Sequence, residues 1–134
     1  IYGHLRFLLI FLLSGIMGNV FSFAFNNAVS AGASTAVFGL FSTIIVMAKA
    51  QPNNSYLQAA ARSYRTLIII NIIFNLFSPG IDLAGHLGGL IGGYFVASAL
   101  THPNRNMRIG HGIAGLVLAL LILSYGLSRA GFTF

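Results

Sequence analysis

Two side chains in this sequence have the types and the setting needed for nucleophilic chemistry, and they are Ser34 and His86. Ser34 lies in the run GASTAVFG at residues 32–39, and His86 lies in the run AGHLGG at residues 84–89. Both stand near the start of long apolar stretches, where a polar group is costly and needs a specific reason. A hydroxyl beside an imidazole is the smallest activated nucleophile, because the imidazole accepts the proton as the oxygen attacks. The two residues therefore predict hydrolytic chemistry, provided that the fold brings them together.

Each residue also has a structural interpretation. A serine in a membrane helix commonly bonds to its own backbone or caps a helix start. A single histidine near a membrane interface can simply contact headgroups or water. What favours chemistry is the matched depth of the two residues, which depends on the elements that position them.

The composition places those elements in lipid. The 134 residues are 57% hydrophobic and 6% charged, against about 25% charged in soluble domains. A spanning helix needs about 20 largely apolar residues, and five stretches approach this length. We therefore predict an all-α polytopic membrane protein with one membrane domain. Its helices are expected at residues 5–25, 31–48, 56–78, 83–100 and 109–128, separated by turns that contain Pro52, Pro79 and Pro103.

The basic residues predict the orientation, since Lys and Arg mark cytoplasmic loops. With residue 1 in the cytoplasm, Arg129 alone falls outside, and six of the seven basic residues fall inside. Those six are Arg6, Lys49, Arg62, Arg65, Arg105 and Arg108. Residues 26–30 and 78–82 then form outer loops. Ser34 and His86 are both expected near this outer surface of a cell membrane.

A stripe of small residues explains how the two could touch. Gly85, Gly89, Gly93 and Ala97 recur every four residues and permit a second helix to approach closely, although such stripes are also ordinary packing devices. His86 lies beside the stripe. If the helix at 31–48 packs there, Ser34 meets His86, and Phe38, one turn further along, can pack against the imidazole ring.

Other ligand and partner classes are disfavoured. The sequence has no cysteine, and its basic residues are scattered between apolar runs, so neither a thiolate site nor nucleic acid binding is predicted. His4, His102 and His111 show no pairing with a carboxylate that suggests a metal. No metal and no cofactor is expected.

Three further polar residues lie near these positions. Asp82 is the only acid and precedes His86 by four residues, so it either orients the imidazole as the third member of a triad or caps the helix start, which we favour. Asn71 and Asn75 share one helix face, and we expect them to pack inside the bundle.

The two motifs carry a resemblance to a known family. GASTAVFG resembles the Gly-x-Ser-x nucleophile motif of rhomboid intramembrane serine proteases, and AGHLGG, continuing to Gly93, resembles their His-x-x-Gly-x-x-x-Gly helix. The opening YGHLRF at residues 2–7 is similar to the start of the family's third helix. The resemblance covers the whole chain, as helices three to six and the seventh helix that some members carry.

The resemblance implies roles for individual residues. Ser34 would be the nucleophile and His86 the general base. Gly32, Ala33 and Ser34 would form the turn whose backbone amides bind the oxyanion. Phe38 would stack on the histidine, and Gly89 and Gly93 would permit the close helix crossing. The segment at 67–77 would correspond to the helix proposed as a lateral substrate gate.

The chain departs from the family pattern in what precedes residue 1. The family's second helix supplies a His and an Asn that complete the oxyanion site, and neither falls within these 134 residues. Because losing one oxyanion donor costs about 10²–10³ in turnover, the isolated chain is expected to be weak or inactive. We expect upstream helices of the same protein to be its partners.

The predicted function is therefore an intramembrane serine endopeptidase that cleaves peptide bonds in or next to transmembrane helices of substrate proteins. The alternatives are a catalytically inactive rhomboid-like protein that binds transmembrane clients and, less favoured, a small transporter or channel subunit.

Overall fold

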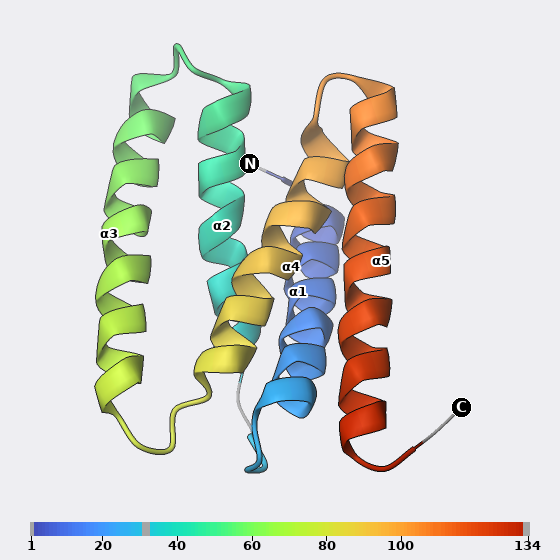
Figure 1. Cartoon of the computed structure of the whole chain (residues 1–134). Helices are drawn as coiled ribbons and strands as arrows, with labels where there is room; N and C mark the ends of the chain where they lie inside the picture. The colour runs from blue at the N-terminus through green and yellow to red at the C-terminus, as the bar shows by residue number, and fades with distance from the viewer. Residues whose placement is uncertain (1, 31–32, 133–134) are drawn as a thin grey trace.

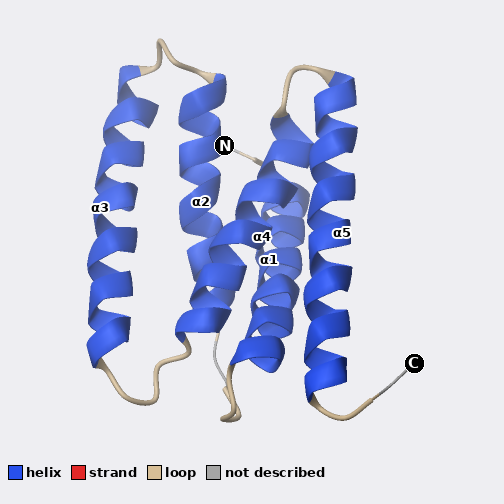
Figure 2. Ribbon diagram, in the orientation of Figure 1, coloured by secondary structure: helices blue, strands red, loops and turns tan. Residues whose placement is uncertain are grey.

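The computed structural model of the chain describes residues 2–30 and 33–132, and within these residues every regular element is a helix. The five helices run up and down in sequence order (Figures 1 and 2). Their bounds are α1 His4–Phe25, α2 Ser34–Ala50, α3 Ser55–Phe77, α4 Leu83–Thr101 and α5 Arg105–Arg129. The predicted all-helical class is confirmed.

Polar side chains at the turns define where three of these helices begin. Asn54 accepts a hydrogen bond from the Leu57 N–H, and Asp82 accepts one from the Gly85 N–H. Asn104 likewise accepts from two amides in the first turn of α5. Such caps satisfy backbone N–H groups that have no partner inside the helix. The cap at Asn104 explains why α5 begins at Arg105, four residues before the predicted start at residue 109.

The other predicted bounds differ by smaller amounts. The helix predicted at residues 56–78 is α3, one continuous helix of 23 residues. The predicted first residue of the second helix, Ala31, lies outside the described residues.

By length and composition, α1, α4 and α5 are able to cross a membrane. Helix α2 is apolar but only 17 residues long, and α3 is long enough but less apolar. Spanning by α2 and α3 therefore stays a prediction.

Helix α4 lies at the centre of the bundle and packs against α1, α2 and α5. Helix α3 packs on α2 at the edge and touches α4 only lightly, as its outlying position in Figure 1 shows. Two glycine faces of α4 make this central position possible. A Cβ at Gly89 or Gly93 would collide with the backbone of α2, and a Cβ at Gly88 or Gly92 would collide with side chains of α1. The small residues therefore set how closely three helices meet.

The turns between the helices lie at two opposite ends of the bundle. Residues 51–54 and 102–104 lie at one end, and residues 26–30 and 78–82 lie at the other (Figure 1). Arg129, at the end of α5, lies at the second end and donates hydrogen bonds to the Ala24 carbonyl, at 2.8 Å, and to the Asn27 side chain. The α2 start and the α4 start share this second end.

Candidate active site

The structure brings Ser34 and His86 into contact. Ser34 is the first residue of α2 and is exposed, whereas His86 lies in the first turn of α4 and is 7% exposed. The Ser34 Oγ lies 2.8 Å from the His86 Nε2, although the residues are 52 positions apart. This distance is normal for a hydrogen bond that can carry a proton between the two groups.

Phe38 holds one face of the imidazole. It lies on α2 one turn after Ser34, and its ring is parallel to that of His86, with 4.3 Å between centroids and 5° between planes. One helix therefore supplies both the hydroxyl and the surface that fixes the plane of the ring. Stacking of this kind restricts rotation of the side chain.

Asn75 meets the imidazole at its second ring nitrogen, Nδ1. Its side-chain Nδ2 lies 2.6 Å from the His86 Nδ1, and both residues are buried. Asn71, one turn earlier, instead donates to the Leu67 carbonyl of its own helix. Both were expected to pack inside the bundle. Asn75 is buried and reaches the histidine, whereas Asn71 is only half-buried and does not. The depth argument that paired Ser34 with His86 applies equally to Asn75, because it lies near the end of its helix on the same side.

Asp82 acts as a helix cap. Its Oδ1 accepts from the Gly85 N–H at 2.8 Å, and its buried Oδ2 has no hydrogen-bond partner among the described residues. Burial alone raises the pKa of Asp82, but the neighbouring polar groups together outweigh burial and hold that pKa below its ordinary value. These groups are Ser22, the Gly85 amide, Ser30 and Asn26. Since Asn75 takes the Nδ1 of His86, the geometry favours the cap over the triad.

The crossing of α4 and α2 sets the distance between the pair. A Cβ at Gly89 would overlap the Thr35 carbonyl group, and a Cβ at Gly93 would overlap the backbone of Gly39. Thr35 follows Ser34 directly, and Gly89 lies one turn after His86. The glycines therefore act next to both members of the pair.

The turn before Ser34 is only partly described. Ala33 precedes the helix and has no side chain that caps it, and Gly32 lies outside the described residues. The first N–H groups of α2 have no carbonyl partner within the helix. They carry the positive end of the helix dipole and are able to bind an anion.

Comparison with known proteins assigns the family. The sequence model of the rhomboid domain matches residues 1–103, which is most of the chain and includes both motifs. The chain belongs to the rhomboid family. It is 40% identical over 129 residues to the rhomboid protease GluP of Bacillus subtilis, with 94% of this chain and 25% of that protein covered. It is 33% identical over 100 residues to Rhomboid-like protease 1 of Toxoplasma gondii, with 71% and 34% covered.

The rhomboid assignment and the apolar helices together make this a multi-pass membrane protein of an intramembrane protease family. The match to the domain ends before α5, whereas the similarity to GluP covers most of the chain. The chain spans a quarter to a third of the length of these two relatives.

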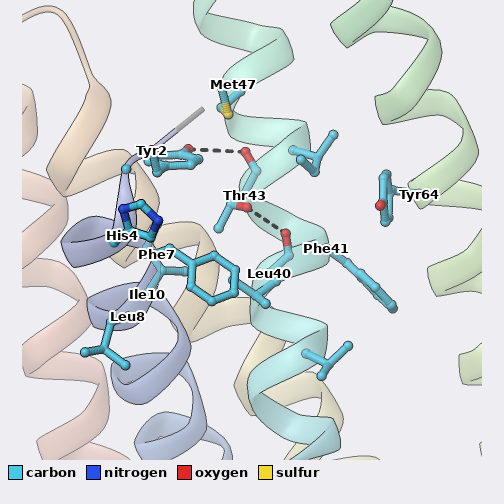
Figure 3. A pocket seen from close by; sticks show the side chains of 13 residues that line it. Tyr2, His4, Phe7, Leu8, Ile10, Leu40, Phe41, Thr43, Met47 and Tyr64 are labelled. Atoms are coloured by element: carbon cyan, nitrogen blue, oxygen red, sulfur yellow. Dashed lines mark hydrogen bonds between the residues drawn. The ribbon is translucent and has the colours of Figure 1, made fainter.

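A large cleft of this rhomboid chain lies away from the Ser34–His86 contact. It has a volume of about 790 Å³ and opens between the first half of α1, α2 and Tyr64 of α3 (Figure 3). Tyr2 donates to the Thr43 carbonyl across it at 3.4 Å. Its walls are mainly apolar, and neither Ser34 nor His86 lines it. The candidate active site is therefore the contact between α2 and α4, not this cleft.

Two of the other three histidines lie at the opposite end of the bundle. The rings of His102 and His111 stack with 5.7 Å between centroids, and each Nδ1 bonds to a nearby backbone group. Within the described residues, no three His, Cys, Asp or Glu side chains gather as a metal site.

Proposed function

We propose that Ser34 and His86 are the catalytic dyad of an intramembrane serine endopeptidase, in which this chain is part of a longer protein. The observation that carries the proposal is the 2.8 Å contact between Ser34 Oγ and His86 Nε2. It joins the two motifs that resemble the family's nucleophile and base. The named proteases among the relatives support the same activity.

In the proposed reaction, the Ser34 Oγ attacks the carbonyl carbon of the substrate peptide bond while its proton passes to His86 Nε2. The tetrahedral intermediate collapses, the C–N bond breaks, and the leaving amine takes the proton from His86. Water then attacks the acyl-enzyme and gives its proton to His86. Release of the carboxylic acid returns that proton to Ser34.

The start of α2 would stabilise the oxyanion. The carbonyl oxygen becomes negative beside Ser34, where the backbone N–H groups of the turn and first helical turn are able to donate to it. We include the amides of Gly32, Ala33 and Ser34 in this role. The exposure of Ser34 is compatible with entry of both substrate and water.

We propose that the substrates are transmembrane proteins in a cell membrane, cut near its outer face. The argument is the charge asymmetry, because the end that carries Lys49 and Arg105 would face the cytoplasm together with residue 1. Ser34 and His86 lie at the other end. Upstream helices of the same protein would supply the remaining oxyanion donors and contact the exposed apolar faces.

Cleavage of a model transmembrane substrate by the full-length protein in liposomes tests this function. We expect Ser34→Ala and His86→Ala each to abolish cleavage, since the nucleophile or its base is lost. Ser63→Ala and His102→Ala are matched controls. Ser63 lies exposed on α3 and bonds only within its helix, at 3.3 Å to the Ala59 carbonyl. Both controls should cleave as wild type does.

Unchanged cleavage in Ser34→Ala would refute the dyad. A wild-type protein that binds transmembrane substrates but releases no product from any of several would favour the inactive, client-binding alternative.

A further inference from the structure

Asn75 makes a buried polar contact with His86 that the proposed reaction does not use. Its amide meets the His86 Nδ1 at 2.6 Å, on the opposite side of the ring from Ser34. Asn75 is 8% exposed and His86 is 7% exposed, so water does not readily replace this bond. It links α3 to α4, two helices that otherwise touch only lightly.

The proton balance of the imidazole gives this contact a chemical meaning. A neutral imidazole carries one N–H and one acceptor nitrogen. To accept the Ser34 proton, Nε2 must be unprotonated, and the ring proton must then be on Nδ1. A partner that accepts a hydrogen bond at Nδ1 favours this tautomer, whereas a partner that donates there puts the proton on Nε2 and blocks the base.

An asparagine amide is able to do either. Its oxygen accepts and its NH₂ group donates, and a half turn of the amide exchanges the two positions. In the structure the Asn75 Nδ2 faces the His86 Nδ1. We propose that a half turn of this amide puts its Oδ1 at the same place, so that Asn75 is a positioning residue whose oxygen accepts from the His86 Nδ1–H and holds the tautomer in which Nε2 is the base. This inference rests on the proposed function of Ser34 and His86.

The surroundings of the ring leave this role to Asn75. Phe38 covers one face of the imidazole, and Ser34 takes Nε2. Asp82, the nearby charged group, directs its Oδ1 to the Gly85 amide. The three ring contacts come from α2 and α3, and among the described residues only the Asn75 amide is placed at Nδ1.

The alternative is that Asn75 merely ties α3 to α4. Asn71 shows that an asparagine in this apolar helix can be satisfied within the helix, through its 2.8 Å bond to the Leu67 carbonyl. Asn75 instead reaches across to the imidazole. A structural tie would affect stability, but it would not set the position of the ring proton.

The test uses the full-length protein in liposomes with Asn75→Leu, Asn75→Asp and the control Asn71→Leu. Two rates are measured across pH, namely substrate cleavage and covalent labelling of Ser34 by a fluorophosphonate. We expect Asn75→Leu to lower both rates by about 10- to 100-fold, in line with the loss of one buried hydrogen bond. Asn71→Leu should match wild type.

The Asn75→Asp variant separates an acceptor from a structural tie. A carboxylate only accepts, so it should restore both rates well above those of Asn75→Leu. It should also move the acid limb of the pH profile to higher pH, because the negative charge stabilises the imidazolium form, which cannot act as base. If Asn75→Asp is folded and as slow as Asn75→Leu across pH, the acceptor role is wrong.

A second measurement tests the inference even if the Asn75 variants fail to fold, because it uses the wild-type protein. Nitrogen-15 NMR of histidine-labelled wild type, with His86 assigned by comparison with His86→Ala, reports which ring nitrogen carries the proton. Protonated Nδ1 supports the inference, and protonated Nε2 in the resting protein overturns it. Equal rates in wild type and Asn75→Leu also overturn it. By contrast, a wild type whose labelling does not depend on Ser34 and His86 would refute the proposed function itself.

Discussion

The contact between Gly89 and Thr35 offers a direct test of how the fold sets the catalytic distance. In Gly89→Ala, the new Cβ would overlap the Thr35 carbonyl group. Because Cβ atoms essentially never lie closer than 3.0 Å to another heavy atom, α4 and α2 must separate locally by at least about 1 Å. Because the contact adjoins both Ser34 and His86, their hydrogen bond should lengthen by a similar amount.

Two opposing effects determine the stability of this variant. Replacing glycine by alanine inside a helix gains about 1 kcal/mol, whereas overpacking costs about 1–3 kcal/mol. Because the overlapped atoms belong to the Thr35 backbone, the overpacking cost should lie at the upper end of this range. The net loss should therefore be about 2 kcal/mol, and the protein should remain folded. Its activity should fall much more, since a misplacement of about 1 Å can cost about 10²-fold in rate.

The assay compares Gly89→Ala with Gly110→Ala in the full-length protein. A Cβ at Gly110 on α5 meets no atom within 4 Å, so this control gains helix propensity without a clash. We expect Gly110→Ala to be as active as wild type with an equal or higher unfolding midpoint. We expect Gly89→Ala to unfold at a midpoint below that of wild type but to stay folded in the assay, and to cleave about 10²-fold more slowly. Wild-type cleavage by folded Gly89→Ala would show that the crossing does not set the distance.

Other predictions test the remaining contacts. Phe38→Leu should slow cleavage by up to about tenfold because the stacked ring is lost, while Phe38→Tyr should retain activity. Asp82→Asn keeps the cap and should cleave nearly as wild type does, whereas a loss above about 10³ would favour the triad. Asp82→Ala should lose about 1 kcal/mol of stability at neutral pH. Because the folded pKa of Asp82 is lowered, this stabilisation is present above the ordinary carboxyl pKa and is lost as pH falls through the folded value, so thermal unfolding midpoints should converge at low pH. Finally, the isolated chain should not cleave substrate in detergent under conditions in which the full-length protein does, and comparable rates would refute a role for upstream helices.

The helices could be predicted from the sequence because lipid imposes a simple rule on length and polarity. Each apolar run has a helix in the structure, and the turns contain the expected Pro, Gly and Asn residues. The start of α5 was less predictable, since three of the four residues at 105–108 are polar and the first turn depends on the cap at Asn104. Such ends depend on individual side-chain bonds, which hydropathy does not report.

The meeting of Ser34 and His86 could be anticipated from depth and from the glycine stripe, since both constrain which residues face each other. Asn75 could not be assigned in this way. Asn71 and Asn75 share a helix face, but α3 lies at the edge of the bundle, so a single turn decides whether an amide reaches α4. That choice depends on the relative positions of two helices that barely touch. A pattern within one helix contains no such information.

The different exposure of Ser34 and His86 fits the different tasks proposed for them. The hydroxyl must meet a substrate carbonyl and later water, and Ser34 is exposed at the start of its helix. The base must keep one orientation and one tautomer, and His86 is buried between Phe38 and Asn75. Placing the serine at an uncapped helix start also puts unpaired backbone N–H groups where the oxyanion would form. A position one turn deeper in α2 would lose those groups, because every N–H there is bonded to a carbonyl within the helix. The proposed chemistry therefore favours a nucleophile at the first residue of α2. The base must then lie at the same end of the bundle, which is where α4 begins (Figure 1).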